Sequence, residues 1–438
     1  MSIDPQIIEA DWTWTGSSFQ SGVQVAVSAS GRIEAVGRMQ GPVTHRLTGR
    51  ALLPGMVNVH SHAFQRALRG YGETFPQASG SFWTWREAMY GLVEKLDADA
   101  FYQWSRQAYA EMLSCGITTV GEFHYFRHDA SCGGFAFDDG LLQAAHDSGI
   151  RLVLLPSYYN TGGVGKPLAG GQKRFACRSA EEYWRQVDRL ASRLRSDRQT
   201  LGASVHSIRA ASVDNLVAIH GECRRRGMVF HMHVEEQCQE IADCVAAYGK
   251  TPMALLNERL EIDERFTAIH GTHTDPQEMR RFAQAGGIVC LCPLSEANLG
   301  DGIPDVPGIQ AAGGPICIGT DSNARICMAE EMRWLEYVQR LAREKRGVCV
   351  DVAGNVAATL LQMATINGAG SLGVKTGRIE QGHWADLMAI DLTNPSLHGW
   401  TPENLLDALV LGTGENVVSA VYVGGKLTQR SGTPRTQS

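Results

Sequence analysis

Two histidines close an apolar stretch near the start of the chain, where residues 60–66 read HSHAFQR directly after the run ALLPGMVNV. Imidazole nitrogens are among the ligands that Zn²⁺ and similar borderline cations prefer. His60 and His62 are therefore candidate metal ligands at the end of a buried strand. The remaining ligands of such a site have to come from other strands.

Polar side chains end several other apolar runs in the same way. They are Glu122, His124, Tyr125, His206, Arg209, His231, His233, Glu235, Glu236, His270, His273 and Asp321. One more imidazole from residues 228–236 and a carboxylate from residues 315–322 would complete a shell of nitrogen and oxygen ligands. These run ends are the first place to look for catalytic chemistry.

Eight short apolar runs alternate with longer amphipathic stretches along the chain. The runs cover residues 51–60, 116–125, 150–159, 201–209, 228–236, 266–273, 287–295 and 315–322. Helices are predicted over residues 98–116, 179–196, 213–227, 251–260 and 276–286. Eight strand–helix units predict an α/β fold of the parallel (β/α)8, TIM-like barrel type. In such barrels the active site lies at the carboxyl ends of the strands, where the polar residues are found.

The two ends of the chain show a different pattern. Residues 1–50 and 378–438 contain short alternating stretches typical of strands, such as VQVAVSASGRIEAVG and VVSAVYVGGKL. We expect them to form one small β-sandwich domain built from both termini, with the catalytic barrel over residues 51–377.

Composition limits the classes of partner. The formal net charge of the 438 residues is −6, and no long run of one sign occurs, so neither nucleic acid nor a membrane surface is expected as a partner. The start of the chain lacks a signal-peptide pattern and no stretch is apolar enough to cross a membrane, which predicts a cytoplasmic protein. The 11 cysteines have no CxxC spacing, so neither a disulfide framework nor a cysteine zinc site is expected.

The histidine and aspartate pattern resembles the amidohydrolase superfamily, in which the pair after strand one, a histidine ending strand five and an aspartate ending strand eight hold the metal. The resemblance implies His60, His62, His233 and Asp321 as ligands. His233 is preferred to His231 because His233 and Glu236 supply the H-x-x-E spacing of the mononuclear deaminases, although His231 stays open as the ligand. Strand four offers neither lysine nor carboxylate to bridge two metals, so one divalent ion per chain is expected, with Zn²⁺ favoured over iron or manganese.

The same resemblance implies a hydrolytic mechanism. One Zn²⁺ with an open position would lower the pKa of its bound water from about 15.7 towards 7. Asp321 can accept the water proton, and Glu236 can deliver a proton to the substrate nitrogen. His270 can hydrogen-bond the charge that develops at the attacked carbon. Glu236 could instead be a solvated residue of the acidic stretch VEEQCQE.

Several further stretches resemble the formimidoylglutamate deiminases of histidine degradation: HSHAFQRA, SFWTWREAMY, EFHYF, HSIRA, HVEEQ, LSEANLGDGI and GTDSN. That resemblance implies hydrolysis of N-formimino-L-glutamate to N-formyl-L-glutamate and ammonia, in a chain that forms a homodimer. Two substrate carboxylates suit two arginines, for which Arg86 and Arg209 on the loops after strands one and four are the candidates. Gln65, Tyr125 and His206 can add neutral hydrogen bonds.

Three alternatives remain at this point. A deaminase of a heterocycle such as guanine would share the metal site and differ in the pocket. A binuclear amidase or lactonase is disfavoured by strand four, and a metal-free relative is disfavoured because no ligand is missing. Arg86 and Arg209 could also form ordinary surface salt bridges, and the direction in which Asn323 and Arg325 face is open.

Overall fold

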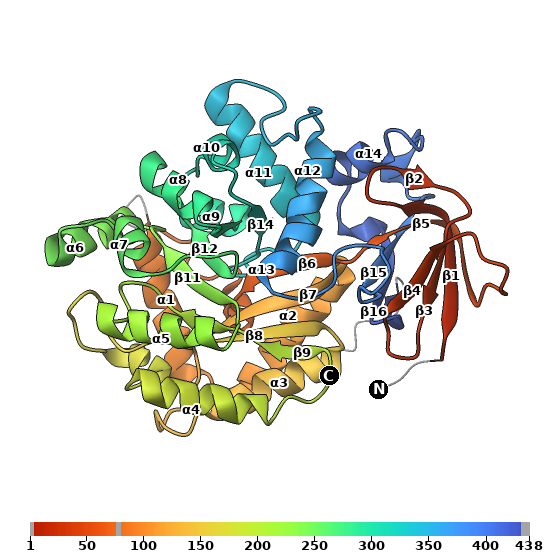
Figure 1. The fold of residues 1–438 in the computed structure, drawn as a ribbon. Helices are drawn as coiled ribbons and strands as arrows, with labels where there is room; N and C mark the ends of the chain where they lie inside the picture. Colours follow the sequence, from red (N-terminus) through yellow and green to blue (C-terminus); the bar gives the residue numbers. More distant parts are fainter. Residues whose placement is uncertain (1–3, 76–79, 431–438) are drawn as a thin grey trace.

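The computed structural model describes residues 4–75 and 80–430. A parallel barrel and a smaller mixed sheet lie side by side, with helices around the barrel (Figure 1). Both parts predicted from the sequence are therefore present. The first three and last eight residues of the expected terminal domain lie outside the described residues.

Each of the eight predicted apolar runs contains one barrel strand. The strands are β6 (Met56–Ser61), β7 (Ile117–His124), β8 (Arg151–Tyr158), β10 (Ala203–Val205), β11 (Phe230–Val234), β12 (Phe266–His270), β13 (Ile288–Leu291) and β14 (Ile316–Ile318), and the short β9 (Gln199–Leu201) also pairs with β8. They pair in parallel and in sequence order. Every residue of these strands is buried apart from Thr200 and Leu201 in β9, as expected for a sheet covered by helices.

Helices surround the barrel: those up to Ala311 lie between its strands, three follow its last strand, and the last helix lies between two strands of the smaller sheet. They are α1 (Phe82–Lys95), α2 (Ala98–Ser114), α3 (Ala136–Ser148), α4 (Ala180–Ala191), α5 (Val213–Arg225), α6 (Cys238–Tyr248), α7 (Pro252–Arg259), α8 (Pro276–Gln284), α9 (Pro293–Leu299), α10 (Val306–Ala311), α11 (Met328–Arg343), α12 (Val356–Gln362), α13 (Gly368–Ser371) and α14 (Leu405–Gly412). The five predicted helices correspond to α2, α4, α5, α7 and α8. Each begins after a side chain that caps it: Asp97, Ser179, Ser212, Thr251 and Asp275. None of the helices in the described part of the chain is long and apolar enough to cross a bilayer.

The smaller sheet combines strands from both ends of the chain. It consists of β1 (Gln6–Trp14), β2 (Phe19–Gln20), β3 (Gln24–Val27), β4 (Ile33–Gly37), β5 (His45–Pro54), β15 (Leu387–Asp391), β16 (Val418–Val423) and β17 (Lys426–Arg430). Its strands share an apolar cluster of their own, which includes Ile8, Val25, Leu52, Leu387 and Tyr422. Hydrogen bonds join all the strands in one mixed sheet, in which β1 and β5 run parallel.

A buried ion pair connects the barrel to this sheet. Arg151 at the start of β8 donates from Nε to Asp386 Oδ2 at 2.7 Å and from Nη2 to Oδ1 at 3.1 Å. The side chains are 2% and 0% exposed. Asp386 also accepts hydrogen bonds from Thr376 Oγ1 and the Gly424 amide. The pair therefore joins β8 to the segments on both sides of β15.

We expect Arg151→Met to lower the free energy of unfolding by about 3 to 5 kcal/mol, because it leaves a buried carboxylate without its counter-charge. Urea denaturation followed by tryptophan fluorescence measures the loss. The matched control is Arg50→Met, which breaks an ion pair with Asp391 whose side chains are each 29% exposed and should cost at most about 1 kcal/mol. Equal losses in the two variants would contradict the prediction.

Candidate metal centre and active-site cavity

The barrel closes where its first and last strands meet, and this closure forms the candidate metal centre. Ser61 pairs in parallel with Asp321 just beyond β14. The Asp321 amide donates to His60 O at 2.9 Å, and the His62 amide donates to Asp321 O at 2.9 Å. Gly319 makes the close approach possible, because a Cβ there would lie 2.8–2.9 Å from atoms of His60. The HSH segment and Asp321 are thus placed together by backbone contacts.

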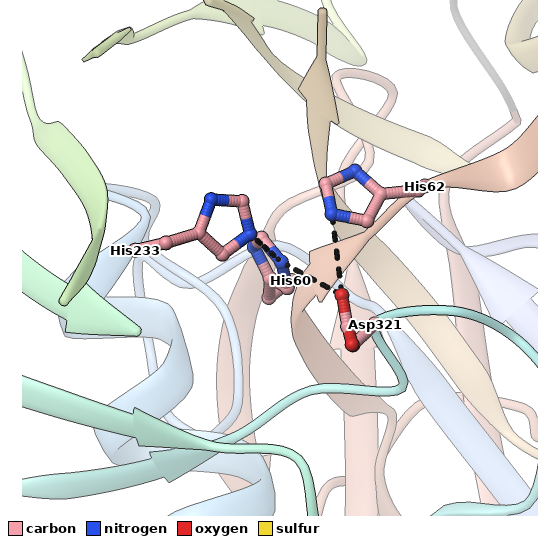
Figure 2. A group of neighbouring side chains, drawn as sticks. All are labelled: His60, His62, His233 and Asp321. Carbon is pink, nitrogen blue, oxygen red and sulfur yellow. Dashed lines mark hydrogen bonds and ion pairs between the residues drawn. The ribbon is translucent and has the colours of Figure 1, made fainter. Parts of the chain in front are cut away.

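Four buried side chains point toward one another at this closure (Figure 2): His60, His62, His233 and Asp321. Asp321 Oδ1 lies 3.1 Å from His60 Nε2 and 3.2 Å from His62 Nε2. His233 Nε2 lies 3.0 Å from His60 Nε2. One ligand atom from each residue lies within 4.8 Å of all the others. For comparison, ligands around a tetrahedral Zn²⁺ lie about 3.4 Å apart, given bonds of about 2.0–2.1 Å.

Backbone carbonyls determine which ring nitrogen of two histidines faces the centre. His62 Nδ1 donates to Phe123 O at 2.9 Å, and His233 Nδ1 donates to His206 O at 2.8 Å. The proton is therefore on Nδ1 in both rings, and each Nε2 presents a lone pair to the centre. This arrangement, with the second nitrogen of a ligand held by a carbonyl, is typical of metal-binding histidines.

The protonation states fit a cation better than an ordinary hydrogen-bond network. Burial lowers the pKa of His60 to about 3 and holds that of His233 well below its usual value. Burial would raise the pKa of Asp321, but its contacts with His60 and His62 keep it well below the usual range. The neutral imidazoles of His60 and His233 and the ionised carboxylate of Asp321 thus direct lone pairs toward one another. A divalent metal ion satisfies all of them at once.

His231, the alternative ligand, lies elsewhere. Its Nε2 is 3.1 Å from Ser371 O at the end of α13, away from Asp321. Asn323 is buried and donates from Nδ2 to Ser61 Oγ and His62 O, so it braces the barrel closure and does not enter the cavity. Arg325 forms an ion pair with Glu330 on α11 and is half exposed. The geometry thus brings His233, and not His231, into the group.

A cavity of about 380 Å³ opens beside the metal group, and His62, His233 and Asp321 form part of its wall. All five residues predicted to contact substrate line it: Gln65, Arg86, Tyr125, His206 and Arg209. Gln65 Nε2 donates to the Tyr125 hydroxyl at 2.6 Å, while Gln65 Oε1 is buried without a partner among the described residues. Burial and the nearby Arg209 hold the pKa of His206 well below its usual value, so this imidazole is neutral.

Arg86 belongs to a helix and not, as predicted, to a loop. It lies in α1, which begins after Ser81, whose amide donates to Thr84 Oγ1 at 3.0 Å. Phe82, Met89 and Val93 form the buried face of this helix, with the spacing of one helical stripe. The guanidinium of Arg86 lies 4.3 Å from the centre of the Trp83 ring. Its Nε is buried and has no hydrogen-bond partner in the described part of the chain.

Glu236, the predicted proton carrier, and His270, the predicted hydrogen-bond donor to the developing charge, lie next to each other at the ends of β11 and β12. Glu236 lines the cavity, and its Oε1 is 3.9 Å from His270 Nε2. His270 is fully buried behind His233 and bonds Glu296 through Nδ1 at 3.2 Å. Burial alone would lower the pKa of His270, but the bond to Glu296 and the charge of Glu236 outweigh it and raise the pKa to about 10. His270 therefore carries a proton on Nε2, and this N–H has no hydrogen-bond partner among residues 4–75 and 80–430.

Arg209 is already paired with Glu236, which sequence reasoning did not predict. Arg209 Nη2 donates to Glu236 Oε2 at 2.9 Å. Sequence reasoning also missed other cavity-lining residues: Trp83, Tyr90, Tyr159, Lys166, Gln239 and Asp243. Most of these residues are on helices and long connections, where no periodic pattern shows which side chains face the cavity. Tyr159 is different, because it ends the predicted run 150–159 and its place at a strand end could have indicated it. Lys166 follows the segment TGGVG in the β8–α4 connection and is exposed at this edge of the cavity.

Comparison with known proteins agrees with this architecture. The chain is 38% identical to the formimidoylglutamate deiminase of Pseudomonas aeruginosa over 390 residues, which cover 88% of this chain and 86% of that protein. An amidohydrolase from Brucella melitensis has a TM-score of 0.88 and 31% identity, over 97% of this chain and 96% of that one. An adenosine deaminase from Xanthomonas campestris with bound zinc has a TM-score of 0.81 and 26% identity, over 96% of this chain and 92% of that one.

The family match covers nearly the whole fold. The amidohydrolase family matches residues 51–428, from the end of β5 through all eight barrel strands to β17. The group of three histidines and one aspartate, together with the zinc bound by one structural relative, indicates a metal centre. On the evidence of sequence, fold and this buried group, the chain belongs to the amidohydrolase family.

Proposed function

We propose that this protein hydrolyses the formimino group of N-formimino-L-glutamate, giving N-formyl-L-glutamate and ammonia, as in histidine degradation. The observation that carries the proposal is that two guanidinium groups, Arg86 and Arg209, share one cavity with the metal group. A substrate with two carboxylates and a small amidine matches that combination of charges. The similarity to the Pseudomonas formimidoylglutamate deiminase supports the same substrate.

For the metal, we propose one Zn²⁺ per chain, held by His60, His62, His233 and Asp321. Three imidazoles and one carboxylate form a nitrogen and oxygen donor set that Zn²⁺ accepts. The described residues contain one group of this kind. At the end of β10 the chain continues with His206 and Ser207, so neither a lysine nor a carboxylate is available there to bridge a second ion.

The residues around the cavity divide the proton transfers between them. A divalent metal in this group would activate a water molecule for attack on the formimino carbon. Asp321 accepts a proton from the attacking water, and Glu236 carries a proton to the nitrogen that leaves as ammonia. The protonated His270 donates a hydrogen bond to the charge that develops during attack. The C–O bond forms and the C–N bond to the terminal nitrogen breaks.

A second candidate is a deaminase of a neutral heterocycle. The structural likeness to an adenosine deaminase and the aromatic side chains of Trp83, Tyr90 and Tyr159 in the cavity wall favour it. A neutral base does not need two guanidinium groups, however, and Arg86 would then face a substrate that gives its buried Nε no counter-charge. Ammonia release from formiminoglutamate, guanine, cytosine and adenosine distinguishes the two functions directly.

Arg86→Met is the sharper mutational test of the substrate. Loss of one charge-assisted contact should lower kcat/KM for formiminoglutamate by about 10- to 150-fold, mostly through KM, while hydrolysis of a neutral N-alkylformamidine should stay nearly constant. Arg86 is preferred to Arg209 for this purpose, because removing Arg209 also leaves the carboxylate of Glu236 without its partner. Unchanged kinetics with formiminoglutamate, or efficient turnover of a neutral heterocycle by the wild type, would end the assignment.

A further inference from the structure

Glu240 is a buried carboxylate that the reaction described above does not use. It lies in the first turn of α6, is 0% exposed, and neither of its oxygens has a hydrogen-bond partner in the described part of the chain. Burying a carboxyl group in this state opposes folding, because nothing replaces the hydrogen bonds that it makes with water. A functional role would explain why the chain keeps this carboxylate buried.

Glu240 lies where a glutamate can cap the start of a helix, but it does not cap α6. Glu240 is the third residue of α6 after the N-cap Gln237. A glutamate at this position commonly turns back and accepts a hydrogen bond from the amide of the N-cap residue. Here α6 has no side-chain cap, and the Glu240 carboxylate is directed elsewhere.

The carboxylate instead lies beside the guanidinium of Arg209. Glu240 Oε2 is 3.8 Å from Arg209 Nε, which is also buried and has no hydrogen-bond partner among the residues that the structure describes. The Nη2 nitrogen of the same guanidinium donates to Glu236 Oε2 at 2.9 Å. The Phe82 ring lies 5.5 Å from the guanidinium carbon. One cation is therefore held between two carboxylates, one that lines the cavity and one that does not.

Burial alone would lower the pKa of Arg209, but Glu240 and then Glu236 outweigh it and raise the pKa, so the guanidinium stays charged. A guanidinium has five N–H donors, and Glu236 uses one of them here. A substrate carboxylate that reaches Arg209 competes with Glu236 for the edge that faces the cavity. Glu240 contacts a different nitrogen, Nε, and does not line the cavity, so an incoming carboxylate meets Glu236 and not Glu240.

We propose that Glu240 is the positioning residue that holds Arg209 in the cavity wall while a substrate carboxylate replaces Glu236 on its Nη edge. The proposal rests on the proposed function. The exchange releases Glu236 from Arg209 when a carboxylate binds, so carboxylate recognition promotes proton transfer through one arginine. Glu240 acts through Arg209 and does not touch the substrate.

The test compares Glu240→Gln with the wild type on two substrates. Burial raises the pKa of Glu240 to about 7, so the kinetics are measured at pH 8.5, where this carboxylate is ionised. With formiminoglutamate, we expect kcat/KM to fall by about 10- to 30-fold, mainly through KM, because Arg209 loses this counter-charge. With a neutral N-alkylformamidine the change should stay within about twofold, since no carboxylate has to be held. Glu240→Asp, which keeps the charge, should recover part of the loss. A fall of equal size on both substrates would overturn the proposal and make Glu240 a purely structural residue.

Glu331→Gln is the matched control. Glu331 on α11 is also 0% exposed, has one oxygen without a partner, and lies outside the cavity lining. This variant should leave the ratio of the two activities unchanged, whatever it does to stability. A shift of that ratio as large as the shift in Glu240→Gln would count against a specific role for Glu240.

A binding measurement separates this proposal from the proposed function. Metal-loaded protein is titrated calorimetrically with N-acetyl-L-glutamate, a dicarboxylate that is not hydrolysed at a formimino group. We expect Glu240→Gln to weaken binding by about tenfold. If the wild type binds this ligand with that dependence but releases no ammonia from formiminoglutamate, the proposed reaction is wrong and the positioning role stands. Equal binding by wild type and variant overturns the positioning role.

Discussion

Asp321→Asn is expected to lose both the metal and the activity. The side chain supplies the negative charge among the four proposed ligands, and its Oδ1 contacts both His60 Nε2 and His62 Nε2. The same carboxylate is the proposed acceptor of the water proton. Metal content should fall from about one ion per chain to a small fraction after dialysis, and turnover should fall by at least about 10³-fold. Elemental analysis of the dialysed proteins and steady-state kinetics measure the two effects.

A matched carboxylate outside the metal group controls for general disruption. Asp301 is buried near Glu236, and burial and then the charge of Glu236 raise its pKa to about 9, so it is neutral at pH 7. Asp301→Asn should therefore keep its metal. Full metal content with lost turnover in Asp321→Asn would limit Asp321 to proton transfer, and two ions per wild-type chain would contradict the mononuclear proposal.

The fold could be predicted because its signals repeat along the chain. Parallel barrel strands are buried on both faces, so each one leaves a continuous apolar run in the sequence, and the eight runs correspond to β6, β7, β8, β10, β11, β12, β13 and β14. Helix starts were visible through capping residues such as Asp97 and Ser212. The helix α1 was missed because the aromatic and charged residues of its sequence, FWTWREAMYGLVEK, obscure the apolar stripe of Phe82, Met89 and Val93.

The candidate site was predictable only in part. Three of the residues, His60, His62 and Asp321, lie at or near the carboxyl ends of strands. The geometry of the barrel alone therefore brings them to the same end of it. His231 and His233 are two residues apart on β11 and share a face of the strand, so spacing could not exclude His231. The two histidines differ in their depth in the barrel. At the depth of His231, its ring contacts the carbonyl of Ser371 in α13.

Contacts between side chains of different loops could not be predicted from the sequence. The Arg209–Glu236 pair joins residues 27 positions apart, and Arg86 reaches the cavity from a helix inserted between β6 and β7. Such contacts depend on how each connection folds over the barrel mouth.

Glu236→Gln is expected to lower kcat by about 10²- to 10⁴-fold, the usual contribution of a general acid or base. The amide keeps the size of the side chain but cannot carry the proton to the leaving nitrogen. The structure adds a second expectation, because Glu236 Oε2 is the acceptor for Arg209 Nη2. Weakening that ion pair leaves Arg209 freer to bind a substrate carboxylate, so KM for formiminoglutamate should stay constant or fall. Metal content should not change.

The adjacent glutamate provides the control for this last prediction. Glu235 is buried and accepts a hydrogen bond from the Met253 amide at 2.9 Å, which the carbonyl of a glutamine can also accept. Glu235→Gln should therefore retain turnover within a few fold, although it carries the same substitution one residue away. A decrease in kcat with constant KM in Glu236→Gln alone identifies a proton carrier, since a residue that only binds substrate would raise KM. Near-normal kcat in Glu236→Gln would remove Glu236 from the reaction and leave it as the partner of Arg209.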